Sequence, residues 1–136
     1  MRNKLIVVAS VIFLDQVLKY LSQQELLPQT EGVFGFLSIC NPLLSWGIPL
    51  EGLFFWMGWF LAFVGLIILI FKFAYNWPLF LTLGGALSNF IDRVRLECVV
   101  DYFKIGSFPI FNLADVFIML GVVIFIYKLG KMGNGR

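Results

Sequence analysis

The sequence predicts an all-α membrane protein with four transmembrane helices and a small extracytoplasmic β element, forming a single membrane domain over residues 1–136. Hydrophobic residues make up 60% of the chain and charged residues only 13%, which is far from the composition of a soluble globular domain. The charges are also bunched, so long apolar runs remain between them. A helix needs about 20 apolar residues to cross a hydrocarbon core, and several runs approach that length.

The first two runs differ in how clearly they predict a spanning helix. The run at about residues 5–21 has a basic start that also suits a secretory signal peptide. Asp15 and Lys19 interrupt this run and no small-residue cleavage site follows, so we interpret it as a membrane helix. The run at 52–73 carries no charge before Lys72 and is the clearest spanning helix.

Two further runs complete the predicted bundle. The third, at about residues 74–91, contains Gly84 and Gly85, which favour close packing against neighbouring helices. The fourth, at about residues 110–129, holds one charged residue, Asp115, before its terminal lysine. Little chain remains outside these runs, so we expect no second domain.

The distribution of Lys and Arg predicts the orientation, because cytoplasmic flanks carry an excess of both. One side of the predicted bundle receives Arg2, Lys4, Lys72, Lys128, Lys131 and Arg136. The other side receives Lys19, Arg93, Arg95 and Lys104, while residues 20–51 contain no basic residue. Both termini should therefore be cytoplasmic, and the segments 22–51 and 92–109 should meet on the outer face.

Composition also excludes several kinds of site. The net charge is only +2 and there is no basic block, so no nucleic-acid partner is expected. The chain has no histidine, which rules out His-based triads and His-ligated metals, and we expect neither a metal nor a cofactor. Cys40 and Cys98 lack metal-ligand spacing, and free thiols are favoured over a disulfide.

Ionisable residues inside apolar runs are expensive and mark functional sites by default. Asp15 and Lys19 stand four apart on one helical face, so they can pair, and a structural or positioning role is favoured for them. Asn89, Asp92 and Arg93 share another helical face. They fit equally well a polar helix end with an Asp–Arg contact and a polar lining that orients an extended substrate.

Two more carboxylates lie near the predicted outer surface. Asp115 follows Asn112 by three residues, and Asp101 stands in an apolar stretch joined to them by a short connection that should fold back onto the bundle. Two aspartates at low dielectric share one proton and can supply both acid and base, as an aspartic protease requires. A carboxylate chain in a bundle suits a proton or cation path equally well, so the residues alone leave both readings open.

Four segments occur in the order of known motifs: residues 15–19 (DQVLK), 84–93 (GGALSNFIDR), 99–103 (VVDYF) and 111–115 (FNLAD). They resemble the motifs of the lipoprotein signal peptidases (signal peptidase II), which are bacterial membrane aspartic proteases. The resemblance implies that Asp101 and Asp115 are the catalytic pair. It also implies a set of polar residues that bind substrate or support the pair: Asp15, Lys19, Asn41, Asn89, Asp92, Arg93 and Asn112.

The resemblance further implies a substrate and a location. The substrate would be a prolipoprotein with a diacylglyceryl-modified cysteine, cut just before that cysteine. Separately from the resemblance, we expect a monomer in contact with membrane lipids. The enzyme would lie in the bacterial cytoplasmic (inner) membrane with its site facing outward. The alternatives are a protein that translocates protons or cations and an inactive relative of the peptidase.

The outer segments contain both a predicted strand and a departure from the family. Residues 32–41 resemble short strand material, which we expect to cradle the substrate. Phe34, Phe36 and Trp46 could equally be interfacial anchors. The family has Asn-x-Gly-Ala-Ala-Phe in this loop, whereas residues 41–47 are NPLLSWG; the connection between the two catalytic motifs is also shorter than in the family.

Overall fold

The computed structural model describes residues 2–28, 32–42, 52–73 and 76–133. Within these ranges the chain forms four helices and two strands. Their order is α1 (Arg2–Gln23), β1 (Phe34–Asn41), α2 (Gly52–Lys72), α3 (Pro78–Leu96), β2 (Val99–Ile105) and α4 (Leu113–Gly133).

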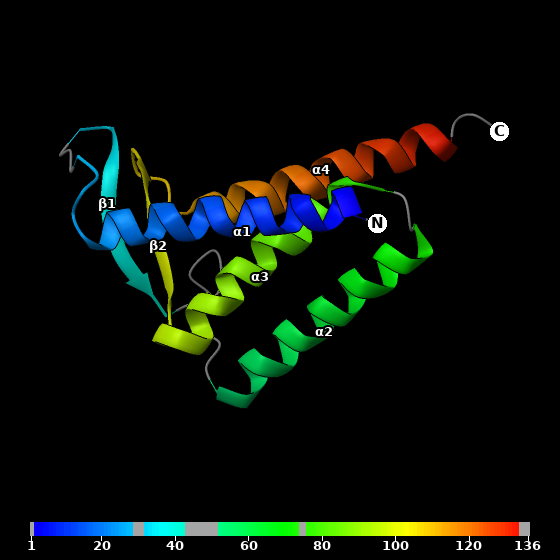
Figure 1. The fold of residues 1–136 in the computed structure, drawn as a ribbon, viewed down its shortest axis with the longest axis horizontal. Helices are drawn as coiled ribbons and strands as arrows, with labels where there is room; N and C mark the ends of the chain where they lie inside the picture. The colour runs from blue at the N-terminus through cyan, green and yellow to red at the C-terminus, as the bar shows by residue number, and fades with distance from the viewer. Residues whose placement is uncertain (1, 29–31, 43–51, 74–75, 134–136) are drawn as a thin grey trace.

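Helix α3 is the central element of the bundle. It packs against α1 and α4, and among the described elements it is the only one that α2 contacts. Figure 1 shows the two strands at one end of the molecule, with the N-terminal end of α1 and the C-terminal end of α4 both directed toward the other end. The sheet thus lies at the end predicted to face outward.

Small residues allow α3 to approach its neighbours closely, as the sequence predicts. A Cβ atom on Gly85 would lie 2.5 Å from the backbone oxygen of Ala114 in α4, and one on Gly84 would lie 2.8 Å from the Val11 side chain in α1. Both distances are too short for real carbon atoms, so only glycine fits at these crossings. Gly121 of α4 meets α3 in the same way, against Thr82.

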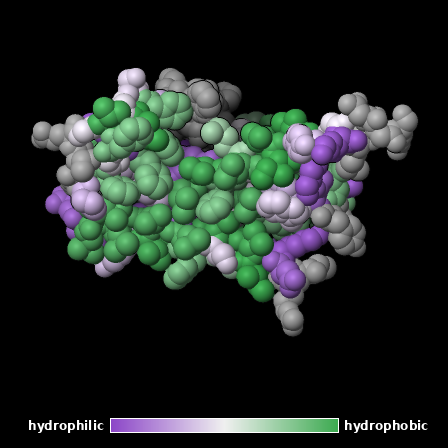
Figure 2. Space-filling view, turned by 90° about the horizontal axis from the view of Figure 1, so that it is seen from above, coloured by the Kyte–Doolittle hydropathy of each residue, from purple (hydrophilic) through white to green (hydrophobic). Residues whose placement is uncertain are grey.

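The helices present an apolar exterior. Helix α1 over Asn3–Gln23 and α4 over Leu113–Lys131 are long and apolar enough to cross a membrane, and α2 has a shorter apolar stretch, Trp56–Lys72. Figure 2 shows a broad hydrophobic belt across the middle, with hydrophilic residues gathered at the two ends. Large hydrophobic side chains are exposed on the helices, such as Phe13 on α1 and Ile126 on α4. A mostly helical protein with apolar helices and a small sheet is therefore confirmed.

The third helix is displaced from its predicted position, and the strands are better defined than predicted. Helix α3 begins at Pro78, whose missing N–H suits a first helical residue, and continues past Asp92 to Leu96, because its polar side chains bind α1 and β2. Strand β1 falls within the predicted residues 32–41. It pairs antiparallel with β2, a strand not predicted, and the register shifts between Phe36 and Ile39.

The prediction of free thiols is wrong. Cys40 near the end of β1 and Cys98 just before β2 form a disulfide, with their Cα atoms 5.5 Å apart. Antiparallel pairing brings these distant residues to neighbouring strands, because Cys40 pairs with Val100 in the sheet register. The sequence places both cysteines in segments expected to meet on the outer face, but it does not indicate the strand pairing that brings them within bonding distance.

Candidate active site

Asp115 is held at the first turn of α4 by Asn112. The Asp115 backbone N–H donates to Oδ1 of Asn112 at 2.9 Å, and the Asn112 N–H donates to Oδ2 of Asp115 at 3.3 Å. This reciprocal arrangement is a capping box, built here from Asn and Asp, that satisfies open N–H groups at the helix start. The carboxylate also lies at the positive end of the helix dipole.

Asp101 enters the same site from β2. Its carboxylate is buried and accepts hydrogen bonds from Asn41 Nδ2 at 2.9 Å and from Asn112 Nδ2 at 2.7 Å. Burial raises the pKa of Asp101 to about 6, because removal from water disfavours the charged form, and the nearby Asp115 charge adds to this. The hydrogen bond from Asn41 is the main opposing effect and lowers the pKa.

The two aspartates are therefore connected through a single residue, Asn112. Asn112 binds Asp101 with its side-chain nitrogen and Asp115 with its backbone N–H. Asn89 of α3 completes the connection, because it donates to Asp115 Oδ1 at 2.9 Å and accepts from Asn112 at 3.1 Å. The predicted meeting of Asp101 with Asp115 near one end of the bundle thus has a specific geometry.

Beneath this pair lies a buried charge network. Lys19 contacts Asp15 and Asp92, each at 2.7 Å, and donates to Asn89 Oδ1 at 2.8 Å. The three charged side chains are 0–3% exposed. Water therefore cannot solvate their charges, and the ion pairs and hydrogen bonds of the network must stabilise these charges instead. The predicted Asp15–Lys19 pairing is confirmed, and its link to Asn89 extends to the Asp115 carboxylate.

Asp92 does more than either interpretation from the sequence predicts, whether a polar helix end with an Asp–Arg contact or a polar lining for substrate. Asp92 forms its ion pair with Lys19, and it also accepts from the Val100 N–H in β2 at 3.2 Å. It is buried and holds three elements together. Arg93 is half-buried and interacts electrostatically with both Asp101 and Asp115, so it lies close enough to affect both carboxylates.

Three residues of the network were not singled out from the sequence. Gln16 donates to Asp92 at 2.8 Å, and Ser88 donates to Asp15 at 2.7 Å. Tyr102 is fully buried; its hydroxyl lies 3.4 Å from Asp15 and accepts the Leu113 N–H at 3.1 Å. Burial raises the pKa of Tyr102, so the hydroxyl remains a donor. Gln16 and Ser88 could have been found as polar residues within apolar runs.

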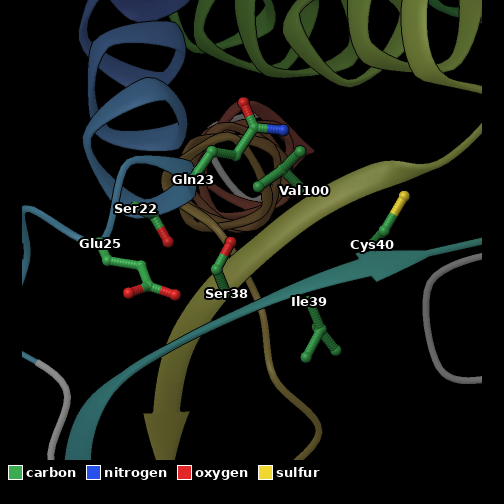
Figure 3. A pocket seen from close by; sticks show the side chains of 7 residues that line it. All are labelled: Ser22, Gln23, Glu25, Ser38, Ile39, Cys40 and Val100. Atoms are coloured by element: carbon green, nitrogen blue, oxygen red, sulfur yellow. The ribbon is translucent and has the colours of Figure 1, made fainter.

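A separate cavity of about 400 Å³ lies between the end of α1 and the strands. Figure 3 shows Ser22 and Glu25 on its helix side and Ser38 on its strand side, with Cys40 and Val100 along the strands. None of the predicted site residues is among those lining it. Within the described part of the chain, no group of three His, Cys, Asp or Glu residues gathers as a metal site requires. Of the altered loop motif, residues 43–47 lie outside the described residues.

Comparison with known proteins gives a consistent result. The family model described as "Signal peptidase (SPase) II" matches residues 7–131. The chain is 37% identical to the lipoprotein signal peptidase of Caldanaerobacter subterraneus subsp. tengcongensis, covering 97% of this chain and 99% of the relative. It is 40% identical to the lipoprotein signal peptidase of Enterococcus faecalis, covering 89% of this chain and 84% of the relative.

Solved structures show the same similarity at the level of the fold. One, described as a bacterial membrane enzyme, superposes with a TM-score of 0.82 at 29% identity and covers 100% of this chain and 93% of its own. A second structure with the same description gives a TM-score of 0.80 at 30% identity, over 95% of this chain and 93% of its own. The family match extends across all four helices and both strands, and the chain therefore belongs to the signal peptidase II family.

Proposed function

We propose that this chain is an aspartic endopeptidase that removes signal peptides from diacylglyceryl-modified prolipoproteins, cutting before the lipidated cysteine, with Asp101 and Asp115 as its catalytic pair. The observation that carries the proposal is that Asn112 binds both carboxylates. Membership of the signal peptidase II family supports the substrate class.

The chemistry follows from two carboxyl groups that differ in protonation. Asp101, with a pKa of about 6, is ionised at neutral pH and takes a proton from water, which attacks the scissile carbonyl carbon. Asp115 acts as the acid: it holds the proton that the pair shares and donates it to the carbonyl oxygen, giving a neutral tetrahedral intermediate. The C–N bond then breaks as the departing nitrogen receives a proton from Asp101, while Asp115 takes a proton back from one hydroxyl of the intermediate as the C=O bond re-forms. The signal peptide leaves with a free carboxyl terminus, and the pair returns to its starting protonation.

Burial separates the supporting residues into two roles. Asp15, Lys19 and Asp92 are almost fully buried, so they position α1, α3 and β2. Asn41, Asn89 and Arg93 are half-buried and can also donate to carbonyl groups of an extended signal peptide. Asn112 is fully buried and holds the catalytic pair.

We also propose a membrane topology, based on where the basic residues lie. The four helices would each cross the cytoplasmic membrane, with both termini inside and the sheet and dyad outside. In support, Lys4 lies over the Phe80 ring and Lys128 over the Trp77 ring, both at 5.2 Å, near the end of α3 remote from the sheet. This basic cluster matches the excess expected on the cytoplasmic side. The protein would act as a monomer among membrane lipids.

The purified full chain in detergent provides the direct test. We expect it to cut a diacylglyceryl-modified prolipoprotein into two products, with mass spectrometry placing the new N-terminus at the lipidated cysteine. The same precursor without the lipid should remain intact. In sealed vesicles the chain should carry no proton or cation flux above a lipid-only control. Ion flux without cleavage would overturn the proposal in favour of a transporter.

A further inference from the structure

The Cys40–Cys98 disulfide lies at the end of the sheet that carries Asn41 and Asp101. Cys40 precedes Asn41, the residue that donates to Asp101, and Cys98 stands three residues before Asp101 itself. The bond closes a separation of 58 residues and joins the end of β1 to the start of β2. Cys98 is buried and Cys40 is exposed, so a small dithiol can reach the Cys40 sulfur.

The two strands are not equally anchored without this bond. Strand β2 has other partners, because the Val100 N–H donates to Asp92 and the Tyr102 and Phe103 N–H groups donate to the Phe111 oxygen. Strand β1 contacts only β2 and α1 among the described elements. After the register shift, β1 pairs through Ile39, Cys40 and Asn41 alone, and a two-stranded ribbon is marginally stable by itself.

The end of β1 also carries a group that Asp101 needs. Asn41 Nδ2 donates to Asp101 Oδ2 at 2.9 Å, whereas Asn112 donates to the other oxygen from α4. Fraying of β1 would remove the first donor and leave the second in place. Asp101 would remain in the site with one oxygen free to rotate or to bind water.

We propose that the Cys40–Cys98 disulfide is a positioning clamp that keeps the Asn41 side chain on Asp101, so that breaking it slows peptide cleavage without unfolding the protein. This inference rests on the proposed function. Reduction by a dithiol passes two electrons and two protons to the disulfide, giving the Cys40 and Cys98 thiols and a cyclic disulfide of the reagent. The chain contains no other cysteine, so the reagent acts at this bond alone.

Cleavage by the full chain in detergent, before and after dithiothreitol treatment, measures the clamp. Mass spectrometry after alkylation verifies that both thiols have formed. We expect kcat to fall on the order of tenfold, as for the loss of one hydrogen bond to a charged group, and to recover on reoxidation. The acid limb of the pH profile should move to higher pH, because Asn41 no longer lowers the pKa of Asp101.

Two variants separate positioning from a general effect of the reagent. The double variant Cys40→Ser/Cys98→Ser should match the reduced enzyme and ignore dithiothreitol. Asn41→Ala should show the same loss of kcat with the disulfide intact, and reduction should then change nothing further. An Asn41→Ala enzyme that loses another tenfold on reduction would overturn the inference, as would an unchanged kcat and pH profile in the fully reduced wild type.

Hydrogen exchange tests the clamp independently of cleavage. Reduction should speed exchange in a peptide covering 34–42, while the amides of Val100, Tyr102 and Phe103 keep their protection through Asp92 and Phe111. If reduction changed the exchange rates of β1 and β2 by the same amount, or changed neither, the proposed clamp would be overturned. Failure of the oxidised protein to cut any lipidated precursor would instead overturn the proposed function, and the exchange result would still decide whether the disulfide anchors β1.

Discussion

Asn112 donates from its side-chain nitrogen to Oδ1 of Asp101 at 2.7 Å, and its own side-chain oxygen caps the backbone of Asp115. One fully buried side chain therefore fixes a carboxylate on a strand relative to the first turn of the helix that carries the second carboxylate. A buried amide has no water to replace a lost partner, so this arrangement resists displacement of either aspartate.

Replacement of either aspartate by asparagine should abolish cleavage. Asp101→Asn and Asp115→Asn keep the size of the side chain, but an amide cannot cycle a proton, and general acid–base catalysis contributes about 10²- to 10⁴-fold. Single-turnover cleavage of a lipidated precursor measures the loss. Each variant must first match the wild type in yield and thermal melting. Cleavage near the wild-type rate by either variant would remove that residue from the catalytic pair.

The pH dependence of cleavage should reflect Asp101. Its pKa in the folded chain is about 6, above the ordinary 3.8, so the catalytic carboxylate is lost as pH falls through about 6. We expect kcat/KM to fall about tenfold per pH unit below that value. The effect of pH on folding stability has the opposite sign. Between these two pKa values the folded protein binds more protons at Asp101 than the unfolded chain does, so the contribution of Asp101 to stability declines as the pH rises from one value to the other. A profile that is flat down to the ordinary carboxyl range would contradict the assignment.

Removal of the buried lysine should destabilise the protein strongly. Lys19→Met removes the ammonium group that pairs with the buried carboxylates of Asp15 and Asp92. Removing one partner of a buried ion pair lowers the free energy of unfolding by about 3–5 kcal/mol. Lys72→Met is the matched control, because Lys72 is exposed at the end of α2. Thermal unfolding in one detergent compares the two. Equal melting temperatures would show that the network contributes little to folding.

A single added methyl group at the α3–α4 crossing should impair both stability and cleavage. Gly85→Ala places Cβ against the Ala114 oxygen, and such overpacking costs about 1–3 kcal/mol. Separation of the helices would also weaken the Asn89–Asp115 hydrogen bond that crosses between them. Gly65→Ala in α2 has open space around the new carbon and should be neutral or slightly stabilising. Melting and cleavage measured on both variants check this, and parallel behaviour of the two would contradict close packing at Gly85.

Much of this architecture was predictable because hydropathy and helical spacing act locally. The apolar runs predicted the helices, the four-residue spacing predicted the contact of Asp15 with Lys19, and Gly84 and Gly85 predicted close packing. The carboxylates Asp101 and Asp115 were also expected to meet. Each of these inferences depends on residues near one another in sequence or on a short connection.

The remaining features depend on contacts between distant segments. Spacing along one helix suggested equally an Asp92–Arg93 contact and a polar lining for substrate, and it did not indicate that Asp92 binds Lys19 across the bundle. The disulfide depends on strand pairing, and β2 is a strand because β1 lies beside it. The hydroxyl of Tyr102 has a role only because Asp15 and Leu113 are brought to it. No local pattern encodes such meetings.

The buried Asp15 has a consequence for biosynthesis. Its donors Ser88 and Ala114 lie 73 and 99 residues further along the chain, so neither exists when a ribosome has just completed α1. During that interval Lys19, one helical turn away, is the partner already synthesised. The pair can enter the bilayer with no net charge. Asp15 then gains its remaining hydrogen-bond donors when α3 and α4 pack against α1. In a chain lacking Lys19, Asp15 would have no oppositely charged partner on its own helix during that interval, before any active site has formed.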